Sequence, residues 1–154
     1  DEYFVDIRSD AVREIVAARM DVCEAKGFHG VEPDNVDGYA NASVFALTDA
    51  DQLAYNRFLA AEAHARGLSI GLKNDLGQIE ELAPDFDWAL NEQCLQYKEC
   101  QALAPFMDPA HPEPEGYRLL AEDQRVEGVP VVAEAPRDEA VVGRVEHRRH
   151  HEAR

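Results

Sequence analysis

Residues 67–75 read GLSIGLKND, and this stretch indicates the fold of the protein. Gly67 stands where a helix ends, because glycine readily adopts the left-handed conformation that terminates helices. The apolar run Leu68–Leu72 follows and has the length of a buried strand. The run ends in two polar side chains, Lys73 and Asn74. A helix end, a short apolar strand and a polar strand end in this order are typical of parallel α/β proteins.

Two similar βα units precede this stretch. We expect a strand at Tyr3–Ile7, followed by a helix that Ser9 caps and Gly27 terminates. A second strand is expected at Gly30–Glu32, and a long loop connects it to a helix capped by Thr48. An acidic residue stands three positions after that threonine, which is the spacing of a capping box.

One more unit follows. We expect a short helix near Gln78–Leu82, a fourth strand at Trp88–Leu90 and a last helix at Gln93–Leu103. Parallel strands bring their carboxyl ends to one face of a sheet, so polar strand ends predict a functional face. The alternative is that polar residues only mark where strands stop. The polar strand ends are Asp6, Arg8, Glu32, Asp34, Asn35, Lys73, Asn74, Asn91 and Glu92.

The composition changes after residue 107. Residues 108–154 contain no Lys, Ser, Thr, Asn, Ile, Phe, Trp, Cys or Met, and five of the eight prolines of the chain lie there. Apart from the apolar run Val129–Ala133, neither helical nor strand periodicity persists. We therefore expect two parts, an α/β domain over residues 1–107 and a poorly ordered, unrelated tail over residues 108–154. The histidines near the end show no regular metal-ligand spacing, so no metal site is predicted.

Charge narrows the classes of partner. Thirty-one acidic residues stand against fifteen basic ones, which gives a formal net charge of −16. Such a surface repels nucleic acid and favours neutral or cationic partners, although acidity can also serve solubility alone. The sequence contains no run of about 20 apolar residues, the length needed to cross a membrane, and no signal peptide is recognisable in it. A disulfide between Cys94 and Cys100 is possible, but the sequence leaves it open.

The stretch that begins at the second expected strand contains the first candidate catalytic residues. Residues 30–39 read GVEPDNVDGY and bring three carboxylates, Glu32, Asp34 and Asp37, together with the aromatic ring of Tyr39. Hydrolysis of a glycosidic bond requires two carboxyl groups, one to protonate the leaving oxygen and one to act as nucleophile or base. A calcium site is the alternative, but the spacing and the absence of a distal Glu do not fit an EF-hand.

Further candidates follow the third and fourth strands. Glu92 comes directly after an apolar strand, which suits a proton donor, and the alternative is a Glu that interacts with a helix dipole. Lys73 and Asn74 are suited to hold carboxylates ionised and to donate hydrogen bonds to sugar hydroxyls. They would equally serve as a salt bridge and a helix cap.

Five stretches, in order, resemble glycoside hydrolase family 114, the endo-α-1,4-polygalactosaminidases. They are VDIRS at 5–9, GFHGVEPDNVDGY at 27–39, GLSIGLKND at 67–75, FDWALNEQC at 86–94 and YKEC at 97–100. The resemblance implies a (β/α)8 TIM barrel that cleaves a cationic, galactosaminogalactan-like polysaccharide without a cofactor. A full barrel has eight strands and about 250 residues, so the chain would hold about four βα units of it.

The resemblance also assigns residues. The catalytic pair of the family falls on Asp34, as nucleophile or base, and on Glu92, as general acid. The residues that would line the sugar-binding cleft are Asp6, Glu32, Asn35, Asp37, Tyr39, Lys73, Asn74 and Gln93.

The chain departs from the family pattern mainly in its length, which is too short for a full barrel. In addition, Phe28 stands where the family usually has Cys. Four βα units leave sheet edges open, so we expect these 154 residues alone to cleave slowly if at all. The alternative to an enzyme is therefore an inactive, truncated remnant or a sugar-binding fragment. The intact family member is expected outside the cell or at its surface.

Overall fold

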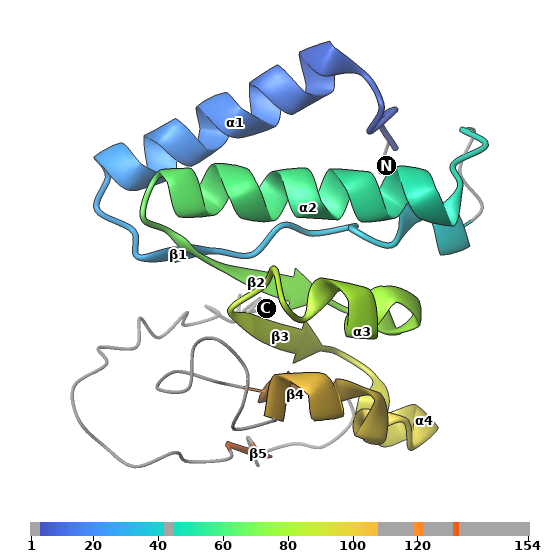
Figure 1. Cartoon of the computed structure of the whole chain (residues 1–154). Helices are drawn as coiled ribbons and strands as arrows, with labels where there is room; N and C mark the ends of the chain where they lie inside the picture. Colours follow the sequence, from blue (N-terminus) through green and yellow to red (C-terminus); the bar gives the residue numbers. More distant parts are fainter. Residues whose placement is uncertain (1–3, 42–44, 108–118, 122–130, 133–154) are drawn as a thin grey trace, which may run out of the picture.

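The computed structural model describes residues 4–41, 45–107, 119–121 and 131–132, and these form a mixed α/β structure (Figure 1). Within the described residues the sheet has the strand order β1-β2-β3-β4-β5. The pairs β1–β2, β2–β3 and β3–β4 are parallel, and β4–β5 is antiparallel. The strands are β1 (Gly30–Val31), β2 (Ser69–Lys73), β3 (Trp88–Asn91), β4 (Leu119–Ala121) and β5 (Val131–Val132).

Two long helices lie beside this sheet, and shorter helices connect its strands. Helix α1 packs on α2, and α2 packs on β2, so α2 lies between α1 and the strands (Figure 1). The helices are α1 (Asp10–Ala25), η1 (Gly38–Ala40), α2 (Asp49–Ala65), η2 (Leu76–Gln78), α3 (Ile79–Leu82), α4 (Cys94–Tyr97) and η3 (Cys100–Met107). None of the described helices is both long enough and apolar enough to cross a bilayer.

The core lies between α2 and the first strands. Leu59 of α2, Ile70 and Leu72 of β2 and Leu82 of α3 are fully buried. Gly71, between the two β2 residues, faces the ring of Trp88 so closely that a Cβ atom at this position would overlap it. The glycine therefore lets the tryptophan ring pack directly against the β2 backbone.

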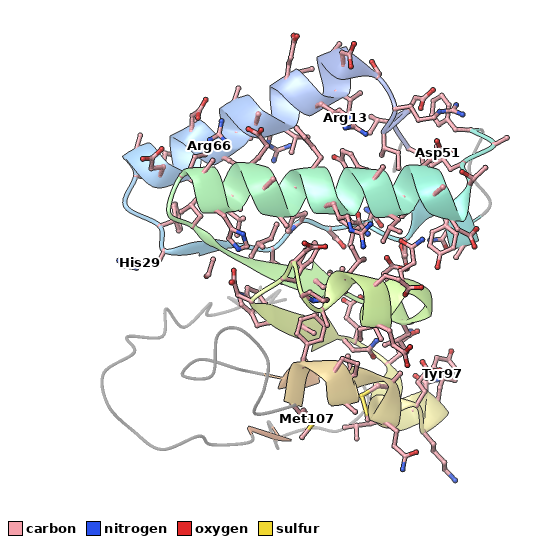
Figure 2. All side chains as sticks on the ribbon, viewed as in Figure 1. Arg13, His29, Asp51, Arg66, Tyr97 and Met107 are labelled. Carbon is pink, nitrogen blue, oxygen red and sulfur yellow. A yellow bond between two sulfur atoms is a disulfide. The ribbon has the colours of Figure 1, made fainter. Side chains whose placement is uncertain are left out.

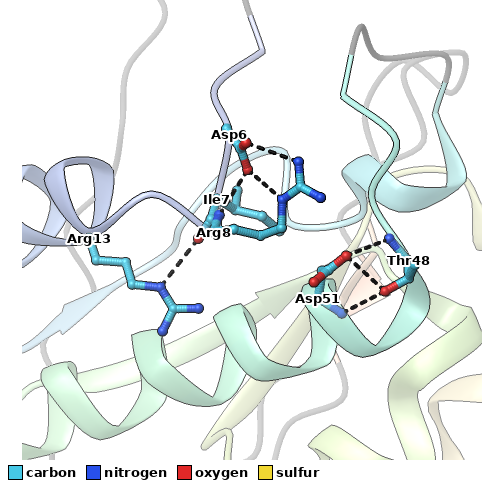
Figure 3. Close-up of polar contacts among 6 residues, drawn as sticks. All are labelled: Asp6, Ile7, Arg8, Arg13, Thr48 and Asp51. Carbon is cyan, nitrogen blue, oxygen red and sulfur yellow. Dashed lines mark hydrogen bonds and ion pairs between the residues drawn. The ribbon is translucent and has the colours of Figure 1, made fainter.

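Both long helices end as the sequence predicts, but only one has a side-chain cap. Gly27 and Gly67 adopt φ of 77° and 67°, the left-handed conformation that their position after a helix requires. Thr48 Oγ1 accepts a hydrogen bond from the Asp51 backbone N–H at 3.2 Å, and the Asp51 carboxylate accepts one from the Thr48 N–H at 2.9 Å (Figure 3). Ser9 stands at the N-cap of α1 and makes no side-chain capping bond.

The strand expected at Tyr3–Ile7 is wrong for the described residues 4–7, and Tyr3 lies outside them. The Asp6 carboxylate accepts hydrogen bonds from the Arg8 backbone N–H at 3.1 Å and from its guanidinium at 2.8 Å (Figure 3). The Asp6 carbonyl also accepts a bond from the Ser9 N–H at 3.0 Å. These contacts close a turn, because an Asp side chain can bond to the backbone two residues later.

The last predicted helix is broken. In place of one helix at Gln93–Leu103, α4 ends before Lys98, which has φ of 60°, and η3 begins at Cys100. A disulfide joins Cys94 to Cys100, so the possibility left open by the sequence is realised (Figure 2). The bridge closes a short loop that a continuous helix would not form.

Strands β4 and β5 lie in the segment for which a poorly ordered tail is expected. Within this segment the structure describes Leu119–Ala121 and Val131–Val132, and the rest of residues 108–154 lies outside the described residues, so the expected tail stays a prediction. Strand β4 pairs with β3, and β5 lies within the apolar run Val129–Ala133. Backbone pairing with the edge of β3, which needs no sequence periodicity, accounts for the missed strand.

Candidate active site

The Lys73 ammonium lies among three carboxylates at the end of β2. Its Nζ is 3.0 Å from Asp34 Oδ1, 3.4 Å from Glu92 Oε1 and 3.8 Å from Glu32 Oε1. The lysine side chain is largely buried, and the Asp34 side chain is mostly exposed. A single cation thus holds together carboxylates that are far apart in the sequence, and we call these four residues the Lys73 cluster.

The strand register brings these residues together. Val31 of β1 pairs with Ile70 of β2, and Lys73 of β2 pairs with Leu90 of β3. Because the three strands are parallel, the residues that follow β1 and β3 meet the end of β2 on one face of the sheet. The expectation that the polar strand ends share a face is confirmed for the Lys73 cluster.

Asp34 and Glu92 approach each other across this face. Since each contacts the same Nζ atom, Asp34 Oδ1 and Glu92 Oε1 lie at most about 6.4 Å apart, the sum of the two contact distances. Glycosidases place their two carboxyl groups about 5–5.5 Å apart when they retain configuration and about 6.5–9.5 Å apart when they invert it. The spacing is therefore compatible with a glycosidase pair.

Asn74 fixes the orientation of Glu92. Its side-chain N–H donates to Glu92 Oε2 at 3.1 Å, and its side-chain oxygen accepts from the Glu92 backbone N–H at 3.2 Å. The backbone N–H of Asn74 donates to the Leu90 carbonyl at 2.8 Å, which extends the pairing of β2 with β3. Asn74 has φ of 58°, a conformation that Asn tolerates better than most residues with a Cβ atom.

The charges within the cluster favour ionised forms. Burial alone would raise the pKa of Asp34, but the hydrogen bond from Lys73, the Asn35 N–H and the lysine charge together lower it. Burial alone would lower the pKa of Lys73, but its pairing with Asp34 and the charges of Glu92 and Glu32 raise it. At neutral pH the cluster therefore holds an aspartate beside an ammonium group.

The other predicted site residues divide among three places. Asp6 pairs with Arg8, and the described contacts do not join it to the Lys73 cluster. Asn35 and Asp34 line a hollow of about 180 Å³ together with apolar side chains that include Phe4 and Tyr55. The remaining predicted residues line a second, polar hollow of about 240 Å³, and they are Asp37, Tyr39, Asn74 and Gln93.

Asp75 also lines the polar hollow, although the sequence does not single it out. It follows Lys73 and Asn74 directly, and its side chain is only 4% exposed. Its Oδ2 accepts a hydrogen bond from Asn56 at 3.0 Å, and Asn56 accepts one from Gln52 at 2.9 Å. The only sequence signal was a carboxylate in the third position of a polar strand end.

Burial governs the protonation of Asp75. Desolvation is the largest cause and raises its pKa from 3.8 to about 7, the charges of Asp37 and Glu81 act in the same direction, and Tyr39 and Asn56 oppose it. The pKa of Tyr39 is raised to about 12, by its own burial first and then by Asp75. Asp75 Oδ1 has no hydrogen-bond partner in the part of the chain that the structure describes.

A metal centre does not emerge from the described side chains. Among residues 4–41, 45–107 and the two short strands, no group of three or more His, Cys, Asp or Glu side chains is arranged to hold a metal ion. The alternative of a calcium loop on Glu32, Asp34 and Asp37 has a specific difficulty. Two of these carboxylates already face the Lys73 ammonium, and Asp37 accepts a hydrogen bond from Asn41 at 3.0 Å.

Comparison with known proteins identifies the family of the chain. A sequence model of the glycoside-hydrolase family GH114 matches residues 1–112. The solved structure of Aspergillus fumigatus Ega3 in complex with galactosamine is similar, with a TM-score of 0.69 and 39% sequence identity. The match covers 84% of this chain and 51% of that one, so the chain spans about half the length of Ega3. No curated protein matches. The chain belongs to glycoside hydrolase family GH114.

Proposed function

We propose that this chain carries the catalytic pair of an endo-α-1,4-polygalactosaminidase, a glycosidase of galactosamine-containing polysaccharide. The observation that carries the proposal is the contact of one lysine with both Asp34 and Glu92 at neighbouring strand ends. Ega3, a relative in structure and sequence, was solved with galactosamine, which supports an amino sugar as substrate. The net charge of −16 supports the same choice, because an anionic protein attracts a cationic sugar chain.

Each carboxylate has a distinct role in the proposed reaction. Asp34 is the nucleophile, because Lys73 lowers its pKa and keeps it ionised at the pH of the reaction. Glu92 is the general acid, and Asn74 holds its carboxyl group in one orientation. Asp34 attacks the anomeric carbon while Glu92 protonates the leaving oxygen, and water then releases the sugar from Asp34 with Glu92 as base.

The spacing favours retention of configuration. The two oxygens lie at most about 6.4 Å apart, and the separation of about 5–5.5 Å that retaining enzymes show falls within this limit. We expect proton NMR of the first product to show the α anomer, the configuration of the substrate bond. An initial β anomer would assign Asp34 as a base that activates water.

The fold and location complete the proposal. The parallel strands β1 to β4, with α2 packed on β2, are consistent with part of a (β/α)8 barrel in which the site lies at the carboxyl ends of the strands.

The disulfide between Cys94 and Cys100 supports an extracellular or cell-surface location, since disulfides persist in oxidising compartments. If free thiols are blocked while the protein is isolated from its native source, Cys94 and Cys100 should be found as the disulfide. Finding them as blocked free thiols would contradict the proposed location.

The central test is cleavage and binding of oligogalactosamine by the chain and by two variants. We expect slow release of reducing ends by the chain, and a loss of about a hundredfold or more on Asp34→Asn or Glu92→Gln. Asp85→Asn is a matched control, because it removes one carboxylate from a surface ion pair with Arg57. Its activity should equal that of the unsubstituted chain.

The other outcomes are equally informative. Binding without cleavage would favour the alternative, a sugar-binding remnant of such an enzyme. Cleavage that survives both substitutions would assign the chemistry to other residues. If the chain neither cleaves nor binds oligogalactosamine, both functions are contradicted.

A further inference from the structure

A buried asparagine of α2 bonds to two loops at the carboxyl ends of the strands. Asn56 lies in the middle of the helix, and its side chain is fully buried. Its Nδ2 donates to the Val36 carbonyl at 2.9 Å and to Asp75 Oδ2 at 3.0 Å. Val36 lies in the loop after β1, and Asp75 lies in the turn after β2. One amide group, with its two N–H donors, therefore links both loops to the same helix.

Both contacts of this amide lie close to the Lys73 cluster. Val36 stands two positions after Asp34, and Asp75 stands two positions after Lys73. Asp34 Oδ1 and Lys73 Nζ are 3.0 Å apart. Because Asn56 is bonded to the loop on one side and to the turn on the other, it limits how far these two charged groups can separate.

The backbone of both loops adopts an unfavourable conformation. Asn35 and Asn74 have φ of 58°, and Asp75 has φ of 43°. Residues with a Cβ atom keep such left-handed conformations where surrounding contacts hold them, and these residues gather at active sites. The bond from Asn56 to Asp75 is such a contact. It holds the turn that also contains Asn74, whose side chain orients Glu92.

A second buried amide orients the first. Gln52, one turn earlier in α2, is fully buried and donates from Nε2 to Asn56 Oδ1 at 2.9 Å. The Val36 carbonyl can only accept a hydrogen bond, so the nitrogen of the Asn56 amide must face it. Gln52 meets the oxygen on the other side of the amide, and this bond disfavours the flipped orientation.

The polar network is a poor way to stabilise a core. Gln52 Oε1 and Asp75 Oδ1 have no hydrogen-bond partner within the described part of the chain, and buried polar atoms without partners are destabilising. Apolar side chains fill the next turn of the same helix, where Leu59 and Ala60 are buried. The contacts of the network with the two loops indicate a role other than stability.

We propose that Asn56 is a positioning residue of the active site, which holds the loop after β1 against the turn after β2. In this way it keeps Asp34 in contact with Lys73. Through the same turn it keeps Asn74 in contact with Glu92. Because Asn56 is fully buried, it acts through these loops and not on the sugar. The inference rests on the proposed function, since it concerns how the same carboxylate pair is held.

Asn56→Leu tests this role, because leucine has a similar shape and lacks the amide. We expect the pKa of Asp34, measured at its carboxyl carbon by NMR, to rise as the aspartate moves away from the Lys73 ammonium group. With oligogalactosamine, kcat should fall at least about tenfold while KM stays within about threefold, since a displacement near 1 Å can cost about a hundredfold in rate. A purely structural residue would change the folded fraction and leave the Asp34 titration of the folded form unchanged.

Two further variants accompany Asn56→Leu. Thr48→Ala is the control, because it weakens the start of the same helix, where Thr48 bonds to Asp51. After correction for the folded fraction, its Asp34 titration, kcat and KM should equal those of the unsubstituted chain. Gln52→Leu removes only the bond that orients Asn56, so it should change the titration and kcat in the same direction as Asn56→Leu, but by less. It decides the question if Asn56→Leu does not fold.

The outcomes separate this inference from the proposed function. If Asp34 titrates in the folded variants Asn56→Leu and Gln52→Leu as in the unsubstituted chain, the role of Asn56 is overturned and the proposed glycosidase stays intact. If the unsubstituted chain cleaves no oligogalactosamine, the proposed activity is contradicted. The Asp34 titration then still decides whether Asn56 holds the two loops together, because this measurement needs no turnover.

Discussion

At the scale of single residues, Lys73 sets the charge state of the proposed nucleophile. Replacing it with glutamine removes the ammonium group that lowers the pKa of Asp34, so this pKa should rise. An NMR titration of the Asp34 carboxyl carbon measures the change directly, and the acid limb of the pH–rate profile should move to higher pH with it.

Lys26→Gln provides the comparison for this prediction. Lys26 is an exposed lysine at the end of α1, so its replacement removes the same charge far from the cluster. Its titration of Asp34 should match that of the unsubstituted chain. If Lys73→Gln also leaves the Asp34 titration unchanged, the charge argument for the nucleophile is wrong.

Asp75 should make stability depend on pH in an unusual direction for a carboxylate. Its pKa rises from 3.8 to about 7 on folding, so between these values the folded state binds the extra proton. The stability from this group is present below about pH 4 and is lost as pH rises through 7.

Asp75→Asn removes that loss of stability. At pH 8 we expect the free energy of unfolding of the variant to exceed that of the unsubstituted chain by about 2–4 kcal/mol. The difference should shrink toward zero near pH 4. Urea unfolding at both pH values measures it. A variant that is less stable at pH 8 would contradict the shifted pKa, whereas a more stable one would show that this residue costs stability.

The residues differ in how far the sequence could identify them. The polar strand ends placed Lys73, Asp34 and Glu92 on one face, because strand direction alone determines which ends meet. The desolvation of Asp75 could not be predicted, since its burial depends on α2 and η1, which are distant in the sequence. Burial and pairing of a carboxylate are tertiary properties.

At the scale of secondary structure elements, the two long helices offer a matched comparison of caps. Thr48 has a capping box and Ser9 has no side-chain capping bond, although both stand at an N-cap. Thr48→Ala should therefore lower the free energy of unfolding by about 1 kcal/mol.

Ser9→Ala should lower it by clearly less, because no capping hydrogen bond is lost. Chemical denaturation of the two variants under the same conditions checks the difference. Equal losses would show that the capping box at α2 contributes no extra free energy of unfolding.

The same elements show where the sequence pattern fails. The helix ends at Gly27 and Gly67 follow from backbone sterics and were predictable. The turn at Asp6 was not, because the largely apolar run of residues 3–7 looks the same whether or not a side chain bonds back to the backbone. The break after Tyr97 depends on a disulfide, and β4 depends on the edge of β3, so neither has a periodic signature.

At the scale of the whole molecule, the net charge of −16 should govern capture of the proposed cationic substrate. The attraction acts over several ångströms and is screened over about 10 Å at 0.1 M salt. We expect affinity for oligogalactosamine to fall at least about tenfold between roughly 20 and 500 mM sodium chloride. Affinity for the fully N-acetylated oligomer should change little.

Binding measured by calorimetry across this range checks the expectation. If both oligomers respond equally to salt, the acidic surface has no role in recognition and serves solubility. If neither responds, contacts inside the site dominate, and long-range attraction is negligible.

The contact between Gly71 and Trp88 makes the sheet observable without a label. Trp88 is the single tryptophan of the chain, and its ring lies over the β2 backbone two residues before Lys73. The intrinsic fluorescence of the protein at long wavelength therefore comes from the junction of β2 and β3. A change in its emission during denaturation or sugar titration would report the separation or tightening of these two strands, of which β2 ends at Lys73 and β3 ends directly before Glu92.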